Sequence, residues 1–258
     1  MSISSFFIKG DHMLKPNEEL HYLFGNERIK MIQRRDMFHF SLDSVLLAAF
    51  VTINKKCRQI VDLGTGNAPI PLYLSTRTKA HITGVEIQKD AYDLAVRNVA
   101  INGLENQIRL VHGDLKGIHH QIDDRQYDVV TCNPPYFKVN KENHFNKNDY
   151  LTIARHEVLA TLEDVVKEAS LLLNNGGYFA MVHRPDRLVE IIETLKKYRL
   201  EPKRLRFIYP KYNKEANTIL IEARKTQRTG GLRILSPVYV YTDDGEYTED
   251  IRKLFILK

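Results

Sequence analysis

Apolar, β-branched runs alternate with segments of helical periodicity between residues 57 and 132. The runs predict four strands, at 58–63, 80–86, 107–113 and 127–132. Between the second and third strands, apolar residues recur at near-helical spacing and stop at Asn102-Gly103, which is typical of a helix C-terminus. Consecutive strand–helix units of this kind predict a parallel sheet, so the fold class is α/β.

The flanking regions carry further signals. Residues 43–51 have the pattern of an amphipathic helix laid on the sheet, and Thr161 and Asp164 have the spacing of a capping box at a helix start. The later elements are predicted as a helix from 161 to the Asn-Asn-Gly-Gly at 174–177, a strand from 178, a helix from 185 to 197, and an antiparallel strand pair at 204–209 and 218–223. Residues 137–157 lack periodicity, so we expect a long loop after the fourth strand.

Length and composition fit a soluble globular protein. The chain has 258 residues, of which 43% are hydrophobic and 27% charged. We expect residues 1–56 to form an extension packed on the core, and residues 57–258 to form one domain with a basic carboxyl-terminal portion. The apolar run 45–51 is too short to span a bilayer, and the N-terminus lacks the basic start of a secretory signal. We therefore expect a cytoplasmic protein without a membrane partner.

The two cysteines exclude some classes of site. Cys57 and Cys132 are far apart and form no C-x-x-C pair, which argues against a disulfide framework and against a zinc site. We expect buried thiols, no metal and a monomeric protein.

Positive charge is concentrated in one segment. Residues 196–233 hold 12 Lys and Arg against 3 acids, a net charge of +9 in a chain whose total is +6, so the rest carries −3. Such a segment favours a polyanionic partner, because phosphate neutralisation provides sequence-independent affinity for nucleic acid. An ordinary solvated lysine-rich face is the alternative.

The motif Asp62-Leu-Gly-Thr-Gly66 follows the first predicted strand and leads into a helix. Gly64 and Gly66 would let a ligand approach the backbone, and the helix amides would meet its polar end. Glu86 ends the second strand, where an acid can accept hydrogen bonds from ribose hydroxyls. Together these residues indicate an adenosine-containing cofactor. A purely structural turn is the alternative, and nicotinamide dinucleotide binding is disfavoured because the third glycine of its fingerprint would fall at Pro69.

Asp114 follows the third strand in the sequence His112-Gly-Asp114. Ligands of open α/β sheets bind beside the carboxyl ends of the strands, so this carboxylate could accept from an adenine amino group. A cap on the turn is the competing interpretation.

The motif Asn133-Pro-Pro-Tyr136 directly follows the fourth strand. The prolines fix an extended backbone, which would aim the Asn133 side-chain oxygen and the Pro134 carbonyl at the two hydrogens of one amino group. Tyr136 could stack on a flat base. The nitrogen lone pair would then face a sulfonium methyl for in-line displacement, so the chemistry is proximity and orientation without a metal or general base. A Pro-Pro turn without function is the alternative.

With these motifs in this order, residues 57–136 resemble a class I S-adenosylmethionine-dependent methyltransferase that acts on amino groups. The resemblance implies a Rossmann-like fold with a seven-stranded, mostly parallel sheet, an antiparallel closing strand and helices on both faces. It also implies roles for the motif residues: Asp62, Gly64, Gly66 and Asn133 at the cofactor, Glu86 at its ribose, Asp114 at its adenine, and Asn133, Pro134, Pro135 and Tyr136 at the target amino group. The chain departs from the pattern at Ala68, where a third glycine is common.

The whole chain resembles the bacterial tRNA1(Val) (adenine(37)-N6)-methyltransferase family, through the segment 38–47, the Ala-Arg-His-Glu at 154–157 and the basic carboxyl-terminal third. This implies N6-methylation of adenine in tRNA. It also implies that Phe40, Ser41 and Asp43 border the methionine end of the cofactor, and that Arg155 and His156 approach the substrate. The alternatives are a helix cap for Asp43 and a surface pair for Arg155 and His156.

Asn133 and Pro134, which we call the amino clamp, could hold the amino group of other substrates in the same way. A protein glutamine amide is one, although that family usually has a longer helical front domain. Guanine N2 of ribosomal RNA is another, although those enzymes often have Phe in place of Tyr136. DNA adenine methylation would usually need a recognition insert that this spacing does not accommodate. A cofactor-binding regulator without catalysis is the alternative from another class, and an activity assay separates it.

Overall fold

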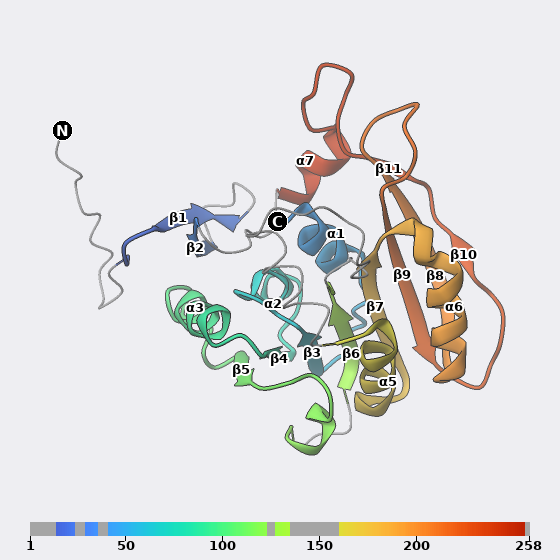
Figure 1. The fold of residues 1–258 in the computed structure, drawn as a ribbon, viewed down its shortest axis with the longest axis horizontal. Coiled ribbons are helices and arrows are strands. Elements are labelled where there is room, and N and C mark those ends of the chain that lie inside the picture. Colours follow the sequence, from blue (N-terminus) through green and yellow to red (C-terminus); the bar gives the residue numbers. More distant parts are fainter. Residues whose placement is uncertain (1–13, 24–28, 36–40, 123–126, 135–159, 256–258) are drawn as a thin grey trace, which may run out of the picture.

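The computed structural model describes residues 14–23, 29–35, 41–122, 127–134 and 160–255. Several predicted features lie outside the described residues: Phe40, Pro135, Tyr136, Arg155, His156 and the loop at 137–157. The described part is built around one twisted sheet with helices on both faces (Figure 1). The predicted α/β class is confirmed.

Seven strands form the main part of this sheet. Their spatial order is β5 (Ile108–His112), β4 (His81–Glu86), β3 (Gln59–Leu63), β6 (Tyr127–Cys132), β7 (Leu173–His183), β9 (Thr218–Lys225) and β8 (Leu200–Tyr209). β9 is antiparallel to both β7 and β8, whereas the pairs from β5 to β7 are all parallel. The predicted seven-stranded sheet with an antiparallel closing strand is therefore confirmed. The carboxyl ends of β3 to β8 share one edge of the sheet, which we call the carboxyl edge, and the other edge is called the amino edge.

The two faces of the sheet carry separate buried cores. Helices α1 (Leu42–Phe50) and α2 (Pro69–Ser75) contribute to one core, and α5 (Leu162–Leu172) and α6 (Leu188–Lys197) to the other. The remaining helical elements are α3 (Lys89–Ala100), η2 (Ile118–His120), η3 (Pro185–Arg187) and α7 (Glu249–Phe255). The predicted helix at 43–51 is confirmed, and so is the capping box, because Thr161 and Asp164 exchange backbone and side-chain hydrogen bonds.

The boundary between α5 and β7 differs from the prediction. The strand begins at Leu173 and not at Tyr178, because Leu173 is buried and pairs with Tyr127. The ladder then shifts register, and Gly176 adopts φ +87°. The Asn-Asn-Gly-Gly sequence therefore bends a continuous strand and does not connect a helix to it.

Four short strands had no predicted counterpart. β10 (Arg233–Ile234) and β11 (Val238–Tyr239) pair with β8 at the end of the sheet. β1 (Glu18–Tyr22) and β2 (Lys30–Arg34) form an antiparallel pair beside α3. These strands have two to five residues, which is too short for a clear period in the sequence.

Asn98 of α3 and Asn102, which lies two residues after the end of this helix, bind the backbone of β2. The Asn98 side chain accepts from the Ile32 amide at 2.6 Å and donates to the Ile32 carbonyl at 3.1 Å. Asn102, one helical turn later, makes the same pair of bonds with Lys30 at 2.8 and 2.7 Å. Residues two apart in a strand present their backbone groups on one side, so the two amides act in place of a neighbouring strand.

Candidate active site at the carboxyl edge

The glycine loop between β3 and α2 has the shape that the motif predicted. Gly64 and Gly66 have φ values of +67° and +58°, in the left-handed region that glycine adopts readily. A Cβ built on either residue would meet nothing within 4 Å, so open space lies over the loop. The Thr65 amide donates to the Val85 carbonyl at 2.9 Å and holds the loop against β4.

Ala68 stands where related motifs have a third glycine, and it too has a positive φ of +71°. A left-handed conformation costs an L-residue about 1–2 kcal/mol. Two contacts hold it: the Ala68 amide donates to the Thr65 carbonyl at 3.0 Å, and Asn98 Nδ2 donates to the Asn67 carbonyl at 3.0 Å. The departure from the usual motif therefore keeps a left-handed backbone at this position.

Asp62 lies behind the loop. Its side chain is fully buried, and its carboxylate accepts from the Thr65 and Thr131 hydroxyls at 2.7 and 2.6 Å. Burial raises the pKa of Asp62 to about 7. This geometry gives Asp62 a role in holding the loop in place. If Asp62 contributes to cofactor binding, as the motif predicts, it does so by holding the backbone of the loop.

Glu86 ends β4 beside the loop and is almost fully buried. Its Oε2 accepts from the Gly66 amide at 2.8 Å, and its Oε1 accepts from the Gln88 amide at 2.8 Å. Burial raises the pKa of Glu86, and the backbone donors oppose this rise. Each carboxylate oxygen has a second lone pair, so the group can still accept from a ribose hydroxyl.

Asp114 follows β5 at the same edge. The Gly113 amide donates to the Glu86 carbonyl at 3.0 Å, so the residue just before Asp114 is bonded directly to the end of β4. Its Oδ1 accepts from the Lys116 amide at 2.9 Å, which is the turn cap that competed with an adenine contact in the sequence. With 37% of its side chain exposed, the carboxylate can cap the turn and also meet a ligand.

Asn133 follows β6 and lies beside the end of β3, because Cys132 pairs with Leu63. Its Nδ2 donates to the Ser44 hydroxyl at 3.1 Å. Asn133 and Pro134 are both half-buried, and the other two residues of this motif lie outside the described part of the chain. The structure thus brings the glycine loop and the predicted amino clamp to neighbouring strand ends.

Helix α1 reaches this site with its first turn. Ser41 is the N-cap residue and Asp43 is the second residue of the helix, so the interpretation of Asp43 as the cap is wrong. Ser44 is the functional candidate that the sequence analysis missed. No motif marks it, since its contact with Asn133 joins residues 89 positions apart.

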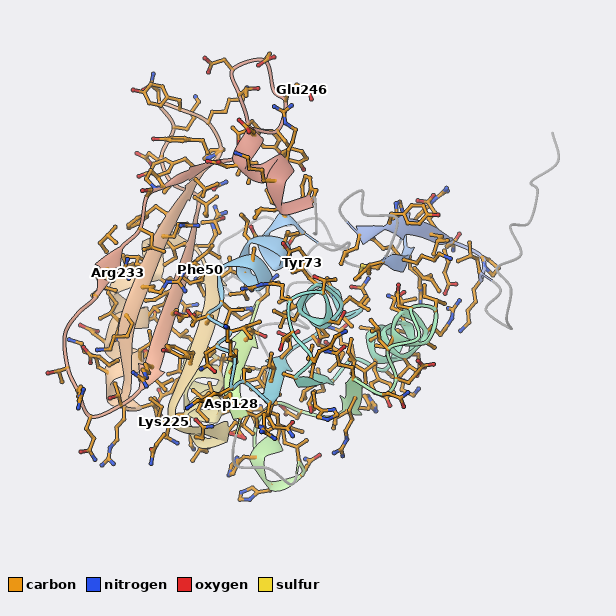
Figure 2. All side chains as sticks on the ribbon, turned by 180° about the vertical axis from the view of Figure 1, so that it is seen from behind. Phe50, Tyr73, Asp128, Lys225, Arg233 and Glu246 are labelled. Atoms are coloured by element: carbon orange, nitrogen blue, oxygen red, sulfur yellow. The ribbon has the colours of Figure 1, made fainter. Side chains whose placement is uncertain are left out.

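The basic segment 196–233 is not gathered at this site. The end of α6, the start of β8 and the end of β9 lie at the amino edge, where Figure 2 places Lys225 near Asp128 and far from Glu246. Several of its charges also contact the protein itself, namely Lys197 with Glu163, Lys203 with two carbonyls, Arg204 with Glu222, Arg224 with the Gly176 carbonyl, and Lys225 with two carbonyls. The segment's charge alone is therefore weak evidence of a nucleic-acid contact.

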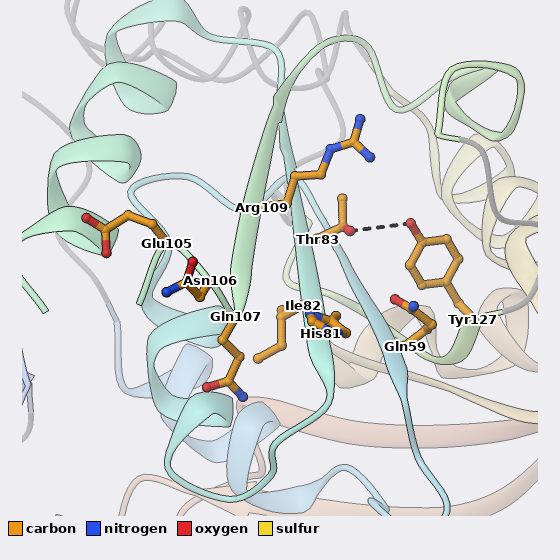
Figure 3. Close-up of a pocket in the computed structure, with 9 residues that line it drawn as sticks. All are labelled: Gln59, His81, Ile82, Thr83, Glu105, Asn106, Gln107, Arg109 and Tyr127. Carbon is orange, nitrogen blue, oxygen red and sulfur yellow. Dashed lines mark hydrogen bonds between the residues drawn. The ribbon is translucent and has the colours of Figure 1, made fainter. Parts of the chain in front are cut away.

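A hollow of about 200 Å³ lies elsewhere on the sheet (Figure 3). Its lining residues are Gln59, His81, Ile82, Thr83, Glu105, Asn106, Gln107, Arg109 and Tyr127. They come from the starts of four strands and the turn before β5, and Tyr127 donates to the Thr83 hydroxyl at 3.4 Å. This hollow does not include the glycine loop, so it is separate from the candidate site.

Across the ranges that the structure describes, no three or more His, Cys, Asp and Glu side chains are grouped so that they could hold a metal ion. None of the helices in the same ranges is long and apolar enough to cross a membrane.

The chain was compared with known families and proteins. The family profile of the methyltransferase small domain matches residues 39–200. A tRNA1(Val) (adenine(37)-N6)-methyltransferase of Porphyromonas gingivalis strain W83 is 30% identical over 256 residues, which cover 91% of this chain and 98% of the relative. An enzyme of the same name from a Shewanella species is 26% identical over 84% of this chain and 92% of its own length.

Two solved structures share the fold. A predicted O-methyltransferase from Agrobacterium tumefaciens has a TM-score of 0.66 at 22% identity, covering 83% of this chain and 95% of its own. The hMettl16 catalytic domain in complex with the MAT2A 3'UTR hairpin 1 has a TM-score of 0.59 at 17% identity, covering 83% and 80%. At these identities the likeness concerns the fold alone.

Proposed function

This chain belongs to the methyltransferase small domain family and to the tRNA1(Val) (adenine(37)-N6)-methyltransferase family, and from this premise we propose that it methylates the N6 amino group of an adenine in tRNA. The observation that carries the proposal is the position of Asn133 at the end of β6, beside the end of β3 that leads into the glycine loop. A target amino group held by Asn133 would lie next to a cofactor held by that loop. We further propose that one chain forms the whole site and acts in the cytoplasm.

The residues at the carboxyl edge fit S-adenosylmethionine, which supplies a methyl group already activated by a positive sulfur. Gly64 and Gly66 leave open space for an adenosine-containing ligand, and Glu86 offers carboxylate lone pairs beside it. Asp114 is partly exposed at the next strand end, where it could accept from the adenine amino group. Ser41 and Asp43, in the first turn of α1, are proposed to border the methionine end.

Catalysis in this proposal is orientation of the substrate nitrogen. The Asn133 side-chain oxygen and the Pro134 carbonyl accept the two hydrogens of the target amino group. Its lone pair then points at the methyl carbon, a nitrogen–carbon bond forms as the carbon–sulfur bond breaks, and the surplus proton leaves to water. Such alignment is the main contribution expected from a site without a general base. Tyr136 would stack on the target base, and Pro135, Arg155 and His156 would contact the RNA.

One experiment tests the reaction and the substrate together. The purified protein is incubated with labelled S-adenosylmethionine and, separately, with total tRNA, ribosomal RNA, DNA and a release-factor protein, and the labelled product is identified by mass. We expect N6-methyladenosine in tRNA only. Label in guanine or in protein would leave the methyltransferase activity standing and would overturn adenine in tRNA as the substrate.

A second experiment tests the clamp. Asn133→Ala should abolish most of the transfer and leave the Kd for S-adenosylmethionine unchanged, as measured by calorimetry. The matched control is Asn106→Ala, in the turn before β5 and away from this edge. Normal turnover by Asn133→Ala would remove the clamp from the proposal.

A further inference from the structure

An exposed tyrosine lies in the turn that joins β8 to β9. Tyr212 is 67% exposed. The Lys214 amide donates to the Lys211 carbonyl at 3.3 Å and closes a β-turn, in which Tyr212 is the second residue and Asn213 the third. Asn213 adopts φ +61°, a left-handed conformation that asparagine tolerates in turns. The turn therefore presents the Tyr212 ring to solvent next to two lysines.

Two half-buried tyrosines support this ring. The centroids of the Tyr212 and Tyr239 rings are 5.8 Å apart, and Tyr239 lies 5.4 Å from Tyr209. Tyr209 and Tyr239 are paired at the ends of β8 and β11, so both belong to the sheet. Aromatic rings attract each other at such distances, and a tyrosine has only two side-chain torsions to fix. The contact with Tyr239 thus lowers the entropy that the Tyr212 ring would lose on binding a ligand.

This turn lies at the carboxyl edge, as Asn133 does. β8 runs in the same direction as β6, and β7 and β9 lie between them in the sheet. Neighbouring strands are about 4.8 Å apart, so the ends of β6 and β8 are about 14 Å apart. Stacked nucleotides follow one another at about 3.4 Å, so roughly four of them span this distance. A strand of RNA whose target base lies at Asn133 can therefore place a nearby base on Tyr212.

The charges around the turn decide where a polyanion can lie. Residues 242–250, which we call the acidic segment, hold five acids and no base: Asp243, Asp244, Glu246, Glu249 and Asp250. Figure 2 places Glu246 at the end of the molecule opposite Lys225. Lys211 contacts this segment, because its ammonium group donates to the Asp243 carbonyl at 3.2 Å. Lys214 is exposed in the turn itself. Phosphates are therefore expected beside Lys214 and away from the acidic segment, which would repel them.

We propose that Tyr212 stacks on an unpaired base of the tRNA, a few nucleotides from the target adenine, and that Lys214 meets a phosphate beside it. The proposal rests on the proposed function, in which Asn133 holds the target amino group at the same edge. Stacking uses the face of a base, so this contact adds affinity for a single strand without selecting its sequence. Tyr241 is also exposed, but it directly precedes the acidic segment and is not part of this contact.

The first test measures tRNA binding by variants of the full chain. Tyr212→Ala should raise the Kd for tRNA at least about fivefold, as expected for the loss of one stacked base, and should leave kcat at saturating tRNA unchanged. Tyr212→Phe keeps the ring and should bind as the unchanged protein does. The matched control is Tyr241→Ala, which removes an exposed ring beside the acidic segment and should not change the Kd.

The salt dependence of binding separates stacking from an electrostatic effect. Tyr212→Ala removes no charge, so the slope of log Kd against log salt concentration should equal that of the unchanged protein. A smaller slope in Tyr212→Ala would show that the variant loses phosphate contacts and would overturn the assignment of stacking to this ring.

A fluorescent variant reports on stacking directly, because the chain has no tryptophan. Tyr212→Trp introduces a single indole, and tRNA should quench its fluorescence when a base stacks on it. Unquenched fluorescence at saturating tRNA, full tRNA affinity of Tyr212→Ala, or an equal loss of affinity in Tyr212→Phe would overturn the inference alone, provided that the unchanged protein methylates tRNA. Absence of methyl transfer to tRNA by the unchanged protein would instead show that the proposed function is at fault.

Discussion

The Glu86 carboxylate accepts a hydrogen bond from the Gly66 amide at 2.8 Å, and this bond joins the end of β4 to the glycine loop after β3. The other oxygen accepts from the Gln88 amide. The same group that is proposed to bind the ribose thus also holds the loop that is proposed to bind the rest of the cofactor. Loss of this carboxylate should therefore affect the folded protein and the cofactor together.

Glu86→Ala is expected to lower the free energy of unfolding by about 1–3 kcal/mol, because two part-buried backbone amides lose their acceptor. It should also raise the Kd for S-adenosylmethionine at least tenfold. Urea denaturation and calorimetry measure the two quantities. Glu105→Ala removes an exposed acid in the turn before β5 and is the control. Unchanged cofactor affinity in Glu86→Ala would count against the ribose contact.

Asp62 should make stability depend on pH in the protein without cofactor. Its pKa is about 7 in the fold against an ordinary value of 3.8, so the folded state binds a proton that the unfolded state has lost. The stability from this group is complete below about pH 4 and is lost as the pH rises through about 7. Asp62→Asn cannot titrate, so its urea-unfolding free energy should fall less between pH 4 and 7. Identical slopes for the two proteins would show that Asp62 is not protonated in the fold.

Much of the fold could be predicted from the sequence, because the central strands have long apolar runs and clear ends. β6 has the predicted bounds, and β3, β4 and β5 begin or end within one residue of them. The start of β7 could not be predicted, since Asn and Gly favour a loop and a bulge equally. The pairing of Leu173 with Tyr127 decides between them.

The candidate site was predictable where it depends on strand ends. Gly64, Glu86 and Asn133 each follow or end a parallel strand, so they had to meet at one edge of the sheet. Ser44 could not be found in this way, because its contact depends on how α1 lies across the sheet. The spread of the basic segment could not be predicted for a related reason, since a hairpin that spans the sheet distributes its charges over both edges.

Asn98 connects the β1–β2 hairpin to the glycine loop, because its fully buried amide binds Ile32 and also the Asn67 carbonyl. Asn98→Ala should lower the free energy of unfolding by about 2–4 kcal/mol, since three buried backbone groups lose their partner. It should also weaken the binding of S-adenosylmethionine, because Asn67 is next to the strained Ala68.

Asn102→Ala is the matched control for this second effect. Asn102 binds the hairpin at Lys30 and the Asn98 carbonyl of α3, and none of its printed bonds reaches the loop. It should therefore lower stability and leave the Kd for S-adenosylmethionine unchanged. An equal loss of cofactor affinity in the two variants would mean that the hairpin, and not the Asn67 contact, supports the loop.

Two exposed cations on opposite edges of the sheet can show which positive charges meet tRNA. Lys214 follows the carboxyl end of β8 and is exposed at the carboxyl edge, where Asn133 lies. Arg228 follows β9 and is exposed at the amino edge. If the substrate lies across the carboxyl edge, Lys214→Ala should raise the KM for tRNA and reduce the salt dependence of binding by about one released counterion. Arg228→Ala, with the same change in net charge, should change both quantities less. A larger effect of Arg228→Ala, measured by filter binding between 50 and 200 mM salt, would place the main phosphate contacts on the amino edge and would require the RNA to extend across the sheet.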